Sequence, residues 1–184
     1  MFVDSLRSRA VLVTGAGGGV GLALAGQLAA AGWTVIVHAG TAEAGDQAVE
    51  RLVKAGAEPL RLEVVSADFN RLGEIARMAR QVGERHPSLD LLVNAAHTVP
   101  GPRRVLTEDG HECAFQTNYL APYLLTRMLA GPLNKGHGRI VSISSILHRG
   151  ARLAWTDLTR AKGYTPLAAY GQATLALTMF TRAL

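Results

Sequence analysis

A glycine cluster between an apolar run and an Ala/Leu-rich segment constrains the fold of this chain more than any other feature. Residues 10–14 form a short apolar run, typical of a strand buried on both faces of a sheet. Residues 20–31 are rich in Ala and Leu and precede Gly32, which predicts a helix and its end. Glycines at such a turn let the backbone approach a pyrophosphate, whose charge a helix N-terminus stabilises. The turn therefore predicts dinucleotide binding.

The remaining sequence alternates between apolar runs and helical patterns. Strands are predicted over residues 33–38, 59–65, 89–93 and 138–144, and helices over 42–55, 71–85, 107–129 and from about 167. This alternation predicts an α/β fold, a Rossmann-like doubly wound parallel sheet with helices on both faces. Ligands of such sheets bind beyond the carboxyl ends of the strands. Without a repeat or linker, residues 1–184 are expected to form a single domain.

Composition excludes several classes of protein. The formal net charge is +5, but the arginines are scattered, so no nucleic-acid partner is expected. One cysteine allows no internal disulfide and no multi-cysteine metal site, so we expect no metal and a reducing, cytoplasmic location. Cys113 lies in an apolar helical pattern, which predicts a buried structural thiol. No stretch is apolar enough to span a membrane, and residues 1–7 are too polar for a signal peptide.

Four motifs match one family in sequence and spacing. They are Thr14-Gly-Ala-Gly-Gly-Gly-Val-Gly21, Phe115-Gln-Thr-Asn118, Gly138-Arg-Ile-Val-Ser-Ile-Ser-Ser145 and Tyr170-Gly-Gln172. From about residue 10 to its end, the chain resembles the short-chain dehydrogenase/reductase family, and its Tyr-Gly-Gln run is similar to that of the retinol-dehydrogenase-like branch. The resemblance implies an NAD(P)(H)-dependent oxidoreductase whose substrate is a small-molecule carbonyl compound or secondary alcohol.

The resemblance also implies three catalytic residues. Tyr170 matches the tyrosine that exchanges a proton with the substrate, Ser145 the serine that polarises its carbonyl, and Asn118 the asparagine that anchors a proton-relaying water. In the family, a lysine one helical turn after the tyrosine holds the nicotinamide ribose and lowers the tyrosine pKa. Thr174 stands at this position and carries no charge.

Three other cations are candidates for the role of the missing lysine. Lys162 precedes the last helix, and His148 and Arg149 follow Ser145 closely enough to reach the same pocket. For Lys162, we favour the interpretation that it is a solvated loop residue.

The cofactor site implied by the resemblance lies at the carboxyl ends of four strands. Its residues are Gly15, Gly17, Gly18, Gly19, Val20, Gly21, Ala39, Gly40, Thr41, Asp68, Phe69, Asn94, Ala95, Ala96 and Tyr170. Asp68 matches an aspartate that accepts a hydrogen bond from the adenine amino group, and it is also compatible with an N-cap of the following helix. Asn94 begins a run that stabilises the sheet edge beside the cofactor.

The second predicted strand indicates which cofactor is used. An acidic residue at its end would bind the ribose of NAD(H) and repel the 2′-phosphate of NADP(H). Residues 39–41 contain no carboxylate, and Thr41 and His38 are candidate donors to a phosphate. The sequence therefore favours NADP(H) over NAD(H).

Three functions stay open at this stage. Besides a working oxidoreductase, the chain is compatible with a cofactor-binding pseudoenzyme or partner subunit, and with a non-redox isomerase or dehydratase that uses Tyr170 and Ser145 for proton transfer.

The family's last two strands have no counterpart before Leu184, so the domain is expected to be truncated at its C-terminus. The resemblance implies a homo-oligomer that pairs through the helices holding Asn118 and Tyr170. The substrate is not encoded in a recognisable motif.

Overall fold

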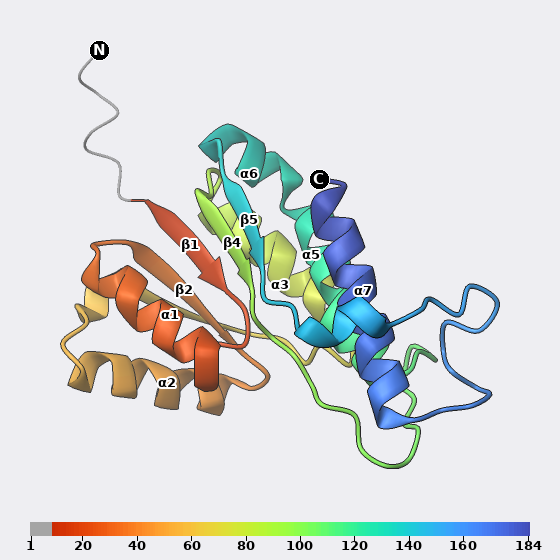
Figure 1. The fold of residues 1–184 in the computed structure, drawn as a ribbon. Helices are drawn as coiled ribbons and strands as arrows, with labels where there is room; N and C mark the ends of the chain where they lie inside the picture. Colours follow the sequence, from red (N-terminus) through yellow and green to blue (C-terminus); the bar gives the residue numbers. More distant parts are fainter. Residues whose placement is uncertain (1–8) are drawn as a thin grey trace.

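The computed structural model describes residues 9–184; the segment judged too polar for a signal peptide lies outside the described residues. Five parallel strands form one sheet in the order β3-β2-β1-β4-β5 (Figure 1). They are β1 (Ala10–Val13), β2 (Thr34–Ala39), β3 (Leu62–Ser66), β4 (Leu91–Asn94) and β5 (Arg139–Ser142). This topology confirms the predicted Rossmann-like parallel sheet.

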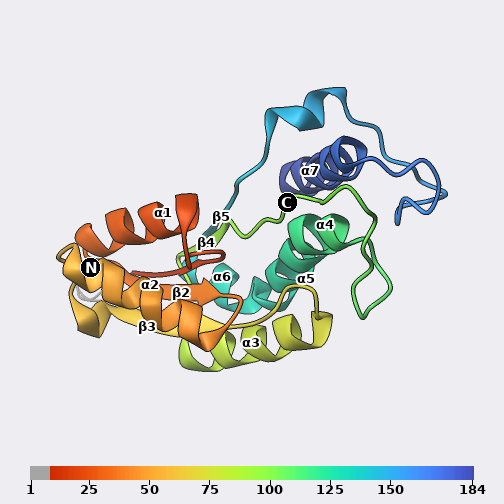
Figure 2. The ribbon, with the colours of Figure 1, turned by 90° about the horizontal axis from the view of Figure 1, so that it is seen from below.

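Helices cover both faces of the sheet. They are α1 (Gly19–Ala30), α2 (Ala42–Lys54), α3 (Leu72–Arg85), α4 (Cys113–Phe115), the π-helix η3 (Gln116–Leu120), α5 (Ala121–Met128), α6 (Ala130–Gly136) and α7 (Pro166–Arg182). Two short 3₁₀ helices, η2 (Pro59–Arg61) and η4 (Ile146–Gly150), precede β3 and follow β5. Figure 2 shows α1 on one side of the strands and α3 on the other.

Side-chain alternation along β1 explains why the sheet has two cores. Val11 and Val13 pack in the cluster that contains buried residues of α1 and α2, whereas Leu12 packs with α3 and α5. All three side chains are completely buried. Successive residues of a strand point to opposite faces, so an uninterrupted apolar run serves both cores. A smaller third cluster joins Phe115 to Ala173 of α7.

Two predicted elements differ from the structure by more than two residues at their start. The strand predicted from Pro59 begins only at Leu62, because Pro59 opens the 3₁₀ helix η2. Thr107 does not begin a long helix, since its hydroxyl accepts from His111 N at 3.2 Å within a turn. The helical segment begins at Cys113, where the Glu112 carboxylate accepts from two backbone amides.

Two of the glycines around the turn between β1 and α1, Gly15 and Gly21, have no space for a side chain. A Cβ atom on Gly15, which has φ +68°, would lie 2.6 Å from the Cα of Ala96 after β4. A Cβ atom on Gly21 would overlap the carbonyl oxygen of Gly15. By contrast, nothing lies within 4 Å of a Cβ atom placed on Gly18, which has an extended backbone with φ −173°. Glycine is thus required at particular positions of this turn.

We expect Gly21→Ala to lower the free energy of unfolding by about 1–3 kcal/mol, because the added methyl group must displace backbone. Gly18→Ala, its matched control, should leave stability nearly unchanged. Urea unfolding followed by circular dichroism measures both. Equal stability of the two variants would contradict this description of the turn.

Candidate active site

A cavity of about 410 Å³ opens at the carboxyl ends of β1 to β4. Its lining includes ten of the predicted cofactor residues: Gly15, Gly18, Gly19, Val20, Gly21, Gly40, Asp68, Phe69, Ala95 and Ala96. No side chain caps the start of α1, which leaves the N-terminal amides of this 12-residue helix available to an anion. The close backbone packing and the uncapped helix fit the pyrophosphate of a dinucleotide.

The other predicted cofactor residues lie beside this cavity rather than in its wall. Gly17 packs near buried Ala39, and Thr41 caps α2 by accepting from Ala44 N at 3.2 Å. Asn94 is buried in β4, and its Nδ2 donates to Ser142 Oγ in β5 at 3.4 Å. This contact joins β4 to β5, and the stabilising role of Asn94 beside the cofactor stays a prediction.

Thr14 fixes the loops that follow β1 and β4 to one another. Its hydroxyl donates to Val93 O at 3.2 Å and accepts from the amides of Ala95 and Ala96 at 3.0 and 3.1 Å. One buried hydroxyl thus pairs the amides of Ala95 and Ala96 at the end of β4, and Val93 O also accepts from the backbone amide of Thr14 at 2.9 Å. The glycine loop and the loop after β4 are held as one wall of the cavity.

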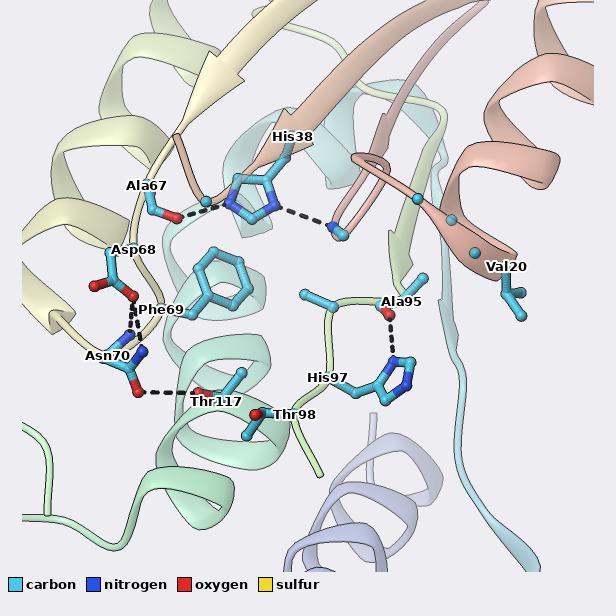
Figure 3. A pocket seen from close by; sticks show the side chains of 16 residues that line it. Val20, His38, Ala67, Asp68, Phe69, Asn70, Ala95, His97, Thr98 and Thr117 are labelled. Atoms are coloured by element: carbon cyan, nitrogen blue, oxygen red, sulfur yellow. Dashed lines mark hydrogen bonds between the residues drawn. The ribbon is translucent and has the colours of Figure 1, made fainter. Parts of the chain in front are cut away.

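His38 links the glycine loop to the loop after β3 (Figure 3). Its Nδ1 accepts from Gly15 N at 3.1 Å, and its Nε2 therefore donates to Ala67 O at 3.0 Å. The ring stacks on Phe69 with centroids 4.4 Å apart, and burial lowers the pKa of His38 to about 4. The prediction that His38 donates to a 2′-phosphate was wrong, because both nitrogens bond backbone and the ring stays neutral.

Asp68 lies in the cavity wall but does not cap the next helix. Its Oδ1 accepts from the backbone and side-chain nitrogens of Asn70, both at 2.9 Å, while α3 begins after Arg71. The N-cap alternative is therefore wrong. The backbone amide of Asp68 donates to Glu74, a contact that lowers the pKa of the Glu74 carboxyl.

The three predicted catalytic residues line a second cavity, of about 240 Å³. Tyr170 comes from α7, Ser145 from the end of the segment after β5, and Asn118 from the π-helix η3. The Asn118 amide donates to Thr98 O at 3.0 Å and accepts from Thr98 N at 2.7 Å. Ser145 begins η4 and accepts from Leu147 N at 3.3 Å. Residues 52 positions or fewer apart thus meet at one point, although their roles stay predictions.

No lysine or arginine lines this second cavity within residues 9–184. The Thr174 hydroxyl lies 3.0 Å from the carbonyl oxygens of both Tyr170 and Gly171, so it bonds its own helix. Lys162 and Arg149 are outside the lining, as is His148, whose Nδ1 contacts Ser145 O at 2.6 Å. None of the three cations proposed from the sequence occupies the position of the missing lysine.

The structure adds a residue that the sequence interpretation missed. His97 lines both cavities, as do Val20 and Ala96, so the two cavities are contiguous along these residues. Its Nδ1 lies 3.2 Å from Ala95 O. The sequence signal was its place directly after the Asn94-Ala95-Ala96 run.

Cys113 was predicted to be a buried structural thiol, but its side chain is only partly covered. Sγ donates to Asn70 Oδ1 at 3.0 Å, and partial burial raises the thiol pKa. Cys113 thus helps to hold the loop after β3 at the edge of the cofactor cavity.

Comparison with known proteins identifies the class and then the family. A parallel sheet of this order with a glycine-lined cavity defines a dinucleotide-binding α/β protein. The family model for short chain dehydrogenase matches residues 9–184, and the chain belongs to the short-chain dehydrogenase/reductase family. It is 34% identical to mouse retinol dehydrogenase 13 over 182 residues, which are 98% of this chain and 54% of that protein. The chain thus spans about half the length of this curated relative.

Solved structures show the same fold. An uncharacterised protein from Mycobacterium paratuberculosis superposes with a TM-score of 0.83 at 33% identity, over 98% of this chain and 63% of that one. A metagenomic short-chain oxidoreductase in complex with NADP superposes with a TM-score of 0.74 at 27% identity, over 97% and 76% of the two chains.

Among residues 9–184 of the present chain, no helix has the length and apolarity to cross a membrane.

His38 makes stability depend on pH. Its pKa is about 4 in the folded state against an ordinary value of 6.5, so the unfolded chain binds more protons between these values. We therefore expect the free energy of unfolding to fall by about 3 kcal/mol as the pH falls through this window, with no further contribution from His38 below it. Urea unfolding at several pH values measures the slope. His38→Gln should remove that slope, and an unchanged slope in this variant would refute the assignment.

Proposed function

We propose that the chain carries the catalytic centre of an NAD(P)(H)-dependent oxidoreductase for a carbonyl compound or secondary alcohol. The observation that supports this proposal is that the cavity of Tyr170, Ser145 and Asn118 adjoins the glycine-lined cavity through shared lining residues. A dinucleotide bound along the shared wall would supply or take up the hydride. A nicotinamide cofactor in the first cavity would thereby meet a substrate in the second.

Each of the three side chains has a part in this proposal. Tyr170 Oη gives a proton to the carbonyl oxygen during reduction and takes one back during oxidation. The Ser145 hydroxyl donates to the same oxygen and orients it. Asn118 positions the loop after β4, because its amide makes two hydrogen bonds to the backbone of Thr98.

A cofactor-binding pseudoenzyme is the alternative that a specific observation favours. With Thr174 bonded to its own helix, no side chain of α7 places a positive charge beside the Tyr170 phenol. Loss of such a charge costs a proton-transfer step about 1–4 kcal/mol of barrier. A chain that binds cofactor and lacks turnover would support this alternative.

The proposal includes NADP(H) as the preferred cofactor. The Arg51 guanidinium of α2 donates to the carbonyl oxygen of Gly17, which brings a positive charge to the glycine loop beside buried Ala39. A 2′-phosphate is attracted to such a guanidinium, whereas the 2′-hydroxyl of NAD(H) gains little from it. Residues 39–41 add no opposing carboxylate.

An apolar substrate fits the surface beside the candidate active site. Ile146 and Leu167 line a cavity of about 440 Å³ together with Gly171, the residue after Tyr170, and they are 71% and 64% exposed. Such exposed apolar side chains favour contact with an apolar molecule. We therefore propose an apolar alcohol or its carbonyl counterpart, in agreement with the likeness to a retinol dehydrogenase. The cytoplasmic location and the homo-oligomer stay predictions.

Arg51→Ala should weaken NADPH binding roughly fivefold and change NADH binding little, because only NADPH presents a 2′-phosphate. Fluorescence titration of the purified chain with each cofactor measures the two dissociation constants. Arg85→Ala, which removes a charge from the end of α3, is the control. Equal losses for both cofactors would contradict the proposed preference, and no binding of either by the unmodified chain would contradict the cofactor site.

Thr174→Lys should raise the rate of carbonyl reduction about tenfold or more by restoring a charge one helical turn from Tyr170. NADPH consumption with a panel of carbonyl compounds measures the rate. Thr178→Lys, with the same charge one turn further along α7, should give no gain. The absence of any gain from Thr174→Lys would show that the site does not use a cation at this position.

A further inference from the structure

We propose that His97 is the acid/base partner of Tyr170 and supplies, as an imidazolium, the positive charge that Thr174 does not provide. This inference rests on the proposed oxidoreductase function. Among the described residues that line the Tyr170 cavity, His97 is the one side chain that can become positively charged. It comes from the loop after β4, whereas Tyr170 comes from α7.

The hydrogen bond of His97 determines which nitrogen can react. A carbonyl oxygen only accepts, so the 3.2 Å contact with Ala95 O places a proton on Nδ1. In the neutral ring, Nε2 is then an unprotonated base. Figure 3 shows the ring between Ala95 and the lilac ribbon of α7, the helix that carries Tyr170. The backbone thus fixes the tautomer of an imidazole that lines the Tyr170 cavity.

The position of His97 suits a proton relay to water. Its side chain is exposed, unlike that of His38, whose two nitrogens both bond backbone. Imidazole is the side chain that gains and loses protons near neutral pH. The other titratable groups in the two cavities are Tyr170 on one side of His97 and His38 and Asp68 on the other.

Tyr170 and His97 can then deliver the proton that the reduction of a carbonyl group requires. The hydride of the reduced cofactor goes to the carbonyl carbon, and the Tyr170 hydroxyl proton goes to the carbonyl oxygen. The resulting phenolate takes the Nε2 proton of the His97 imidazolium. His97 then takes a proton from water, and the reverse sequence serves alcohol oxidation. His97 acts through Tyr170 and is therefore a positioning and relay residue.

Hydrogen bonds on both sides of His97 fix the backbone of the loop after β4. Thr98, the next residue, is held by two hydrogen bonds to the Asn118 amide, and Ala95 and Ala96 are held by the Thr14 hydroxyl. His97 therefore lies between two anchored points. A histidine on a loop fixed on both sides loses little conformational freedom when it acts.

The test compares His97→Ala with His148→Ala in the full chain. His148 is a matched control because its Nδ1 also contacts a backbone carbonyl but its side chain does not line the cavity. We expect His97→Ala to lower the NADPH-dependent rate about tenfold or more, with NADPH affinity within about twofold of the unmodified chain. Free imidazole should restore the rate of His97→Ala, with a pH dependence that follows the added imidazole. Thr174→Lys in the His97→Ala background should also restore it.

Three results would overturn the proposal. The first is an unchanged rate and pH profile of His97→Ala, and the second is a lost rate that neither imidazole nor Thr174→Lys restores. The third is an unmodified chain that binds NADPH without turnover, because no proton is then relayed through His97. Failure of NADPH binding in the unmodified chain would instead count against the proposed function.

Discussion

The close approach of two backbone turns, after β1 and after β4, is the constraint on which the rest of this structure depends. Gly15 leaves no room for a side chain against Ala96, and the Thr14 hydroxyl joins the two loops through three backbone groups. Because β1 and β4 are neighbours in the sheet, this contact lies where the strand order reverses. Ligands of doubly wound sheets bind at this place. The same packing that completes the core therefore shapes the cofactor cavity.

The second cavity depends on the first through the loop after β4. Its residues line both cavities, and Asn118 attaches the loop to the π-helix η3. A π-helix offsets the hydrogen bonding of the surrounding helix by one residue, and such segments are frequent at functional sites. Tyr170 packs from the other side on α7, which contacts the same helical segment through Phe115 and Ala173. The position of the two cavities relative to one another is thus set by backbone anchors.

Features set by local sequence patterns could be predicted here, whereas polar contacts between residues far apart in the sequence could not. The strands and the glycine turn could be predicted, because apolar patterns and parallel-sheet topology dictate them. The meeting of Tyr170 with Ser145 was implied only by the resemblance to the family. The role of His38 could not be predicted, since it depends on backbone groups of the loops after β1 and β3. Arg51 reaches Gly17 across 34 residues, and the sequence does not indicate the direction of its side chain. The wrong prediction for His38 and the omission of Arg51 both concern long-range contacts of polar side chains.

The helix α7 shows why a charge at this site has to come from elsewhere in the present chain. Its hydroxyls form a ladder against β5 and the segment after it: Thr178 contacts Ser144 Oγ at 2.8 Å, and Thr181 donates to Ser142 Oγ at 2.9 Å. Thr174 continues this polar face and bonds backward to its own helix. Neutral hydroxyl pairs hold α7 on the sheet without bringing any positive charge to the Tyr170 phenol. The contacts that pack α7 therefore do not supply a positive charge to that phenol. The loop after β4 can supply one, because its residue His97 lines the same cavity.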